Sequence, residues 1–251
     1  MSKYSYPHYS TCSGYMTDRI RQKYIETAIA EKVLPANAHR MAHIICLAAS
    51  NDINKPIQFW QLYSVLGQDR IVNIVKRFYE QVYADEHWFS SVFSNIGEIS
   101  SHTNSQASMW IDVMGGGQAY HGGEYRLSFH HTHNAVQLMN DRGAQRWVKL
   151  MVDTLNDPLL DLTDDPRVRP SLNTFLSHFL GKYAEQFNFE NCAAFGDTHP
   201  ALKRTINFMN LSEAAIESLT EIELKEALIA RGVDISACVD KQALVNQALR
   251  L

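Results

Sequence analysis

Three histidines fall within four positions of the stretch "LSFHHTHNAV", residues 127–136: His130, His131 and His133. A fourth, His121, lies just upstream. Imidazole nitrogens bind metal ions, so the segment could form a metal site. The cysteines and additional acids that a zinc hydrolase needs are not found near it. The simplest alternative is a group of surface histidines that are solvated at a helix end.

The residues around this segment leave a third reading open. A neutral imidazole that projects from a short helix into an apolar pocket can be the axial ligand of a haem iron. Such a pocket needs aromatic and aliphatic walls. The sequence supplies Phe78, Tyr79, Phe89, Phe93, Trp110 and Trp147 for them.

Composition narrows the class of protein. The chain has 251 residues and a net charge of −4, so it lacks the basic field that attracts nucleic acid or an anionic membrane surface. No apolar run is long enough to span a bilayer, and the start "MSKYSYPHYS" has no signal-peptide core. Four cysteines lie far apart without paired spacing, which predicts reduced thiols and a cytoplasmic protein.

Helical periodicity dominates the chain and predicts an all-α fold. A strongly amphipathic helix follows Gly67, which should stop the helix before it, and another helix over 98–114 should end at the three glycines 115–117. Further helices are expected at 144–155 and 170–187, the latter with a buried apolar stripe.

Both ends extend beyond this block. Residues 1–56 are predicted to be a helical extension, with helices at 16–34 and 36–50 and a linker at 51–56. Residues 189–211 are expected to be a tether before a helical hairpin at 212–251, where Thr220 and Glu223 predict a capping box. This hairpin resembles SAP-like hairpins, but its seven acidic and four basic residues oppose DNA binding. We expect it to dock a protein or to stabilise the chain.

Four motifs within residues 57–188 resemble one family in order and spacing. "VKRFYEQVYADEHWFSSVFSN" is similar to the opening helices of the truncated haemoglobins of the second group, and "MWIDVMGGGQAY" to their helix end with a glycine hinge. "RLSFHH" resembles their short proximal helix and "RWVKLM" the helix with a distal tryptophan. The resemblance implies a two-over-two globin fold that carries haem b, with additional terminal helices.

Carried over residue by residue, the resemblance makes His131 the iron ligand. Leu127, four positions earlier, lies on the same helix face and matches the apolar residue of the family. His130 is the alternative ligand, expected to face the haem carboxylates, and His133 should lie just past the helix. Phe93 and Tyr120 complete the haem contacts.

The distal side of the haem would be formed by Tyr79, His102, Gln106 and Trp147. Hydroxyl, amide and indole groups are donors that stabilise the partial negative charge on bound O₂. A histidine at 102 departs from the small residue that is usual there. It could donate to a gas, gate its entry or swing onto the iron, and we expect it to be mobile near the mouth of the pocket.

The function implied is binding of O₂ or another diatomic gas (NO, CO), with NO dioxygenation or peroxidase-like turnover as further options. The chain has no flavin or nicotinamide motif, so turnover would need an external electron donor. The alternative is a haem-based gas sensor or adaptor that acts through its terminal helices, by a protein partner or a homodimer.

Overall fold

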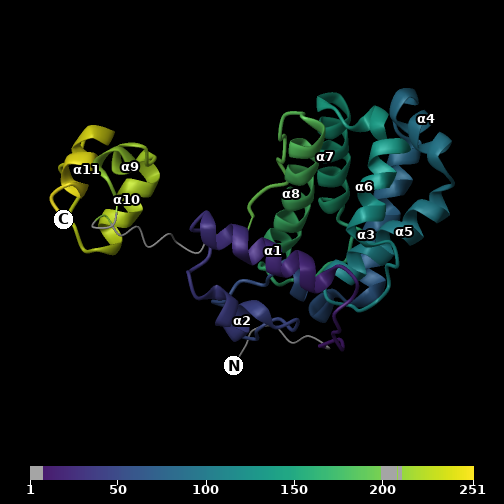
Figure 1. The fold of residues 1–251 in the computed structure, drawn as a ribbon, viewed down its shortest axis with the longest axis horizontal. Coiled ribbons are helices and arrows are strands. Elements are labelled where there is room, and N and C mark those ends of the chain that lie inside the picture. Colours follow the sequence, from purple (N-terminus) through teal and green to yellow (C-terminus); the bar gives the residue numbers. More distant parts are fainter. Residues whose placement is uncertain (1–7, 199–207, 209–210) are drawn as a thin grey trace. The chain divides into compact units, whose positions relative to one another are not determined.

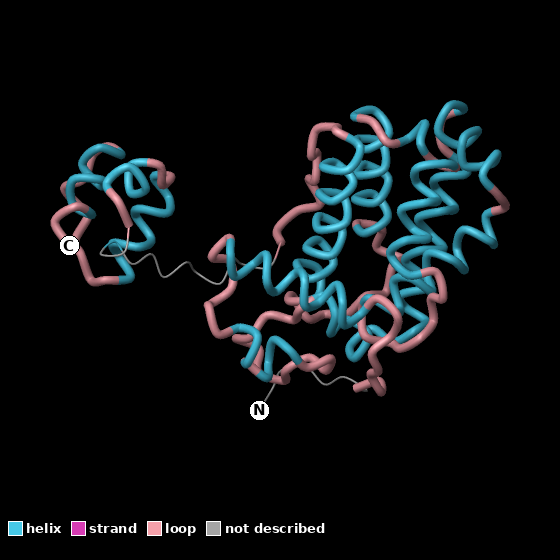
Figure 2. The backbone as a smooth tube through the Cα atoms, in the orientation of Figure 1, coloured by secondary structure: helices cyan, strands magenta, loops and turns pink. Residues whose placement is uncertain are grey.

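The computed structural model describes residues 8–198, 208 and 211–251, which are helices joined by loops (Figure 1, Figure 2). The described residues contain no strand, and a single bridge pairs Cys12 with Gly116. The all-α prediction is therefore confirmed. The chain divides into two compact units, residues 1–201 and 202–251. The α-helices of the first unit are α1 (Thr17–Ala30), α2 (Ala42–Ile45), α3 (Leu62–Ala84), α4 (His87–Ile96), α5 (Ile99–Val113), α6 (Gly123–His133), α7 (Asp141–Leu155) and α8 (Val168–Phe187).

Helix α3 is the centre of the first unit and packs against α4, α5, α7 and α8. Its predicted apolar stripe is buried, with Ile71, Ile74 and Val82 fully excluded from solvent. Burying a large aliphatic side chain stabilises the fold by roughly 1.5–3 kcal/mol. The stripe therefore accounts for the position of α3 among its neighbours.

Two glycine sites shape the helices as the sequence predicted. Gly67 interrupts α3 with a φ of 67°, and the ring of Tyr9 lies against its α-carbon, where a side chain would collide. After α5, Gly115 and Gly117 have φ values of 93° and 104° and turn the chain. The turn also pairs with the N-terminal segment, because the Cys12 amide donates to the Gly115 carbonyl.

The predicted helix 36–50 is wrong. The structure has a 3₁₀ turn, Ala38–Arg40, and the four-residue α2 instead. Side chains of Trp60 and Gln61 donate to the carbonyls of Ile44 and Cys46, which a longer helix would use internally. Tertiary hydrogen bonds thus replace helical ones. The first predicted helix, 16–34, is shorter than expected and ends at Ala30.

Residues 51–56 are an anchored loop rather than a free linker. The Arg167 guanidinium donates to the carbonyls of Ser50, Asp52 and Lys55 at 2.8–3.0 Å. Its charge is balanced by the buried Asp165 carboxylate at 2.8 Å. This single side chain fastens the N-terminal extension to the start of α8.

The second unit contains α9 (Glu213–Glu217), α10 (Glu221–Ala230) and α11 (Lys241–Ala248). Thr220 and Glu223 form the predicted capping box at the start of α10, and Asp240 caps α11. Leu224, Leu228 and Leu244 form the centre of a separate apolar core. The linker predicted at 189–211 lies partly outside the described residues.

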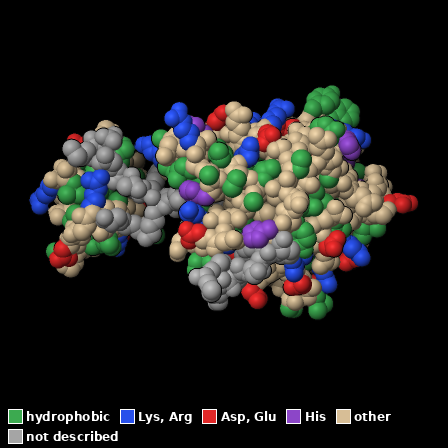
Figure 3. Space-filling view, turned by 90° about the horizontal axis from the view of Figure 1, so that it is seen from below, with side chains coloured by type: hydrophobic (Ala, Val, Ile, Leu, Met, Phe, Trp, Pro, Cys, Tyr) green, Lys and Arg blue, Asp and Glu red, His purple; other side chains and the backbone are tan. Residues whose placement is uncertain are grey.

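Charges are mixed on the surface. Figure 3 shows acidic and basic side chains interspersed over the face in view, without a large patch of one sign. No helix among the described residues has the length and apolarity needed to cross a membrane.

Candidate functional site

A cavity of about 1000 Å³, counted out to its open side, lies between α3, α4, α5, α6, α7 and α8. Its lining is mainly aromatic and aliphatic. Seven of the predicted site residues line it: Tyr79, Phe93, His102, Gln106, His130, His131 and Trp147.

Two predicted haem contacts do not line this cavity. Tyr120 and Leu127 line an adjoining polar groove between α5 and α6, which shares His102, Gln106 and His130 with the cavity. Arg126 also lines the groove and supplies a positive charge there. The cavity and the groove together form one crevice, apolar inside and polar at its edge.

His131 projects from α6 into the cavity wall with one nitrogen fixed. Its Nδ1 lies 2.8 Å from the Leu127 carbonyl oxygen, which can only accept, so Nδ1 carries the proton. Burial above all lowers the pKa of His131 to about 4, so the imidazole is neutral at pH 7. The ring of Tyr183 lies 4.3 Å from it, centroid to centroid. The result is an oriented, neutral imidazole whose Nε2 has a free lone pair.

The neighbouring histidines have different surroundings. The Nδ1 of His130 lies 3.2 Å from the Asn134 amide nitrogen, which donates to it. His133 is the last residue of α6, not beyond it as predicted, and its exposed ring stacks on Phe129 at 4.0 Å. Only His130 and His131 of the cluster therefore reach the cavity.

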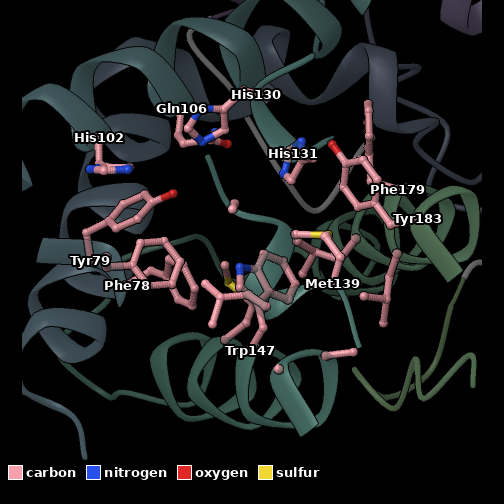
Figure 4. A pocket seen from close by; sticks show the side chains of 18 of the residues that line it. Phe78, Tyr79, His102, Gln106, His130, His131, Met139, Trp147, Phe179 and Tyr183 are labelled. Carbon is pink, nitrogen blue, oxygen red and sulfur yellow. The ribbon is translucent and has the colours of Figure 1, made fainter. Parts of the chain in front are cut away.

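Tyr79 and Trp147 line the cavity away from His131 (Figure 4). Tyr79 is 6% exposed, and its ring is held by Phe78 and Phe93 at 5.2 and 5.9 Å. Burial raises the pKa of its hydroxyl, which stays protonated and can donate. Trp147 is backed by Phe195, whose ring centroid is 5.8 Å away. The cavity thus contains two donors on rings that are fixed by packing.

His102 is buried rather than open to solvent at a pocket mouth. It is 8% exposed, and burial lowers its pKa. Its Nδ1 lies 2.8 Å from the hydroxyl of Tyr83, a residue that sequence reasoning missed. Tyr83 follows Tyr79 by one helical turn, so only the spacing on α3 could have drawn attention to it.

Ion pairs hold the helices that form the crevice. Glu124, in the first turn of α6, lies 2.7 Å from Lys182 of α8 and 3.2 Å from Arg19 of α1. Burial alone would raise the pKa of its carboxyl, but the bond to Lys182 and the nearby positive charges lower it. On the other side, Arg146, next to Trp147, pairs with Asp85 at the end of α3. Ion pairs therefore join α6, which carries His131, and α7, which carries Trp147, to neighbouring helices.

The zinc hydrolase alternative lacks its ligands. Among the residues whose placement is described, no three His, Cys, Asp or Glu side chains gather as a metal site.

Comparison with known proteins agrees with this arrangement. Residues 61–180 match the family model described as bacterial-like globin. The chain is 28% identical over 109 residues to two-on-two hemoglobin-3 of Arabidopsis thaliana; the match covers 43% of this chain and 61% of the relative. No solved structure matches the chain significantly. The resemblance inferred from the four motifs is confirmed to this extent: residues 61–180 match the bacterial-like globin model, and both comparisons support a truncated haemoglobin.

Proposed function

We propose that this globin domain holds haem b through His131 and binds O₂ or another diatomic gas in the cavity. The family implies a haem cofactor and gas binding in general. The observation that carries the assignment to this chain is the neutral imidazole of His131, which has Nδ1 bonded to Leu127 and Nε2 free. Metal-bound histidines use this arrangement, in which the second nitrogen is fixed by a carbonyl.

The residues that line the cavity and the groove also fit haem. Aromatic and aliphatic side chains from six helices would enclose an apolar ring system, and the polar groove with Arg126, Tyr120 and His130 would accept its carboxylates. Haem supplies the iron that binds the gas. Tyr79 and Trp147 keep water out of the cavity and donate to a gas that carries partial negative charge.

Gas binding is favoured over turnover. The donors that the structure brings to the cavity stabilise a held gas, and an external electron donor would be needed for NO dioxygenation or peroxidase-like chemistry. The four cysteines are all unpaired, which supports a reducing, cytoplasmic location.

A second function, as an adaptor or gas sensor, is favoured by the surface of the second unit. Ile222, Ile229 and Val239 are 70%, 59% and 92% exposed there. Exposed apolar side chains of this size suit a protein partner better than a phosphate backbone. A pull-down with and without residues 212–251 tests this function.

The absorption spectrum of the purified full-length chain, expressed with haem supply, tests the main proposal. We expect stoichiometric haem b, identified after extraction, and a reversible spectral change with CO. A chain that takes up no haem would contradict it.

A further inference from the structure

The hydroxyl of Tyr83 decides where the protons lie around His102. Its Oη is 2.5 Å from the Gly97 carbonyl oxygen and 3.3 Å from that of Phe93. Two oxygens this close need a proton between them, and a carbonyl has none. Tyr83 therefore donates its single proton to the Gly97 carbonyl.

The proton of His102 follows from this assignment. Its Nδ1 lies 2.8 Å from the Tyr83 oxygen, which has already used its proton, so Nδ1 is the donor. A neutral imidazole carries one N–H, and burial keeps His102 neutral by lowering its pKa. Its Nε2 is therefore a bare lone pair, and no described residue donates to it.

The same pattern occurs twice in the crevice. His131 and His102 both have Nδ1–H bound to a protein oxygen and a bare Nε2. His130 has the opposite arrangement, because Asn134 donates to its Nδ1. Both bare imidazoles line the same cavity, with His102 beside Tyr79 in Figure 4.

A bare Nε2 on His102 suits metal ligation and is unsuited to donating a hydrogen bond to a bound gas. It is the atom with which a histidine ligates a metal when its other nitrogen is fixed. Toward a gas with partial negative charge it presents a second negative centre, where Tyr79 and Trp147 present donors. The Tyr83 bond therefore makes His102 a ligand rather than a donor.

We propose that His102 is the second axial ligand of the haem iron when no gas is bound, and that Tyr83 is its positioning residue. This inference rests on the proposed binding of haem through His131. An incoming gas must displace His102, so the side chain slows gas association and leaves stabilisation of the gas to Tyr79 and Trp147.

Absorption and electron paramagnetic resonance spectra of the full-length, haem-loaded chain test the proposal. We expect low-spin iron with two nitrogen ligands in the ferric and gas-free ferrous states. His102→Leu should convert both to high-spin and speed CO association at least about tenfold. Tyr83→Phe keeps the ring but frees the tautomer, so a high-spin fraction should appear. Tyr125→Phe, which removes the hydroxyl of a ring that is 81% exposed and lies outside the cavity and the groove, is the matched control and should stay low-spin.

Other results separate the proposed role of His102 from the proposed binding of haem. High-spin iron in the unmodified chain, or low-spin iron that persists in His102→Leu, overturns the role of His102 while haem binding stands. Faster gas dissociation in His102→Leu, with association unchanged, would make His102 a donor and also overturns it. A Tyr83→Phe chain as low-spin as the control overturns the role of Tyr83. A chain without haem removes the proposed function itself.

Discussion

Asp112 and Thr17 are 95 positions apart in the chain and are joined by three hydrogen bonds. The buried Asp112 carboxylate accepts from the amide and the hydroxyl of Thr17, and the hydroxyl also contacts the Asp112 carbonyl. The Met16 amide donates to the same carboxylate at 3.2 Å. The end of α5, which carries His102 and Gln106, is thereby fixed to the start of α1.

We expect Asp112→Ala to lower the free energy of unfolding, because it leaves buried donors of Met16 and Thr17 without an acceptor. Each such donor costs about 1–3 kcal/mol. Asp153→Ala is the control, since the exposed pair of Asp153 with Lys149 is worth only about 0.3–0.5 kcal/mol. Urea unfolding of both variants measures the difference, and equal losses would mean that the bond to α1 contributes nothing.

His131→Ala should abolish stable haem retention, because it removes the only neutral imidazole in the described HHTH cluster whose bare Nε2 faces the cavity. His133→Ala should keep the haem, since His133 is exposed and stacked on Phe129. Haem content after gel filtration gives the answer. Loss of haem in His130→Ala but not in His131→Ala would shift the ligand by one residue.

Tyr79→Phe should speed O₂ dissociation at least about tenfold, since the lost donor is worth about 1.4 kcal/mol or more. The packing of its ring against Phe78 and Phe93 is kept, so only the hydroxyl changes. Stopped-flow dissociation rates check this. A rate within about twofold of the unmodified chain would assign the stabilisation to Trp147 or Gln106 instead.

His178 should make the fold sensitive to acid. Its Nε2 is buried without a partner, and its ring stacks on Phe59 at 5.6 Å. Burial first, and the positive charge of Lys182 second, lower its pKa from 6.5 to about 3. The unfolded chain therefore takes up a proton below about pH 6.5 that the folded chain refuses until about pH 3, so stability is lost as pH falls through this window.

The expected slope is about 1.4 kcal/mol per pH unit for one proton. His178→Phe keeps an aromatic ring in the stack and should flatten that part of the profile, whereas His133→Phe on the surface should not. Free energies of unfolding measured between pH 7 and pH 4 test the sign. An unchanged slope in His178→Phe would mean that another group takes up the proton.

Removal of residues 212–251 should leave the haem spectrum unchanged, because the second unit has its own core around Leu224, Leu228 and Leu244. The spectra of the truncated and full chains are compared directly. Salt-sensitive binding of the full chain to random duplex DNA at micromolar concentration would contradict the expectation that this acidic unit avoids nucleic acid.

Periodicity and the four family motifs were sufficient for α3, α5 and α8 and for seven of the residues that line the cavity. They failed where the structure depends on contacts between distant segments. The segment 36–50 has helical periodicity, but Trp60 and Gln61 take its carbonyls. Tyr83 occupies an ordinary amphipathic position, and its role arises only because the α4–α5 turn brings the Gly97 carbonyl to its hydroxyl.

The wall of the cavity has an optical consequence. Two of the four tryptophans of the chain, Trp110 and Trp147, line it. A pigment that absorbs in the near ultraviolet and sits against both rings would receive their excitation energy without emitting it. The tryptophan fluorescence of the chain should therefore decrease as the pigment binds in the cavity. This decrease can serve as a label-free signal for titrating the pigment into the protein.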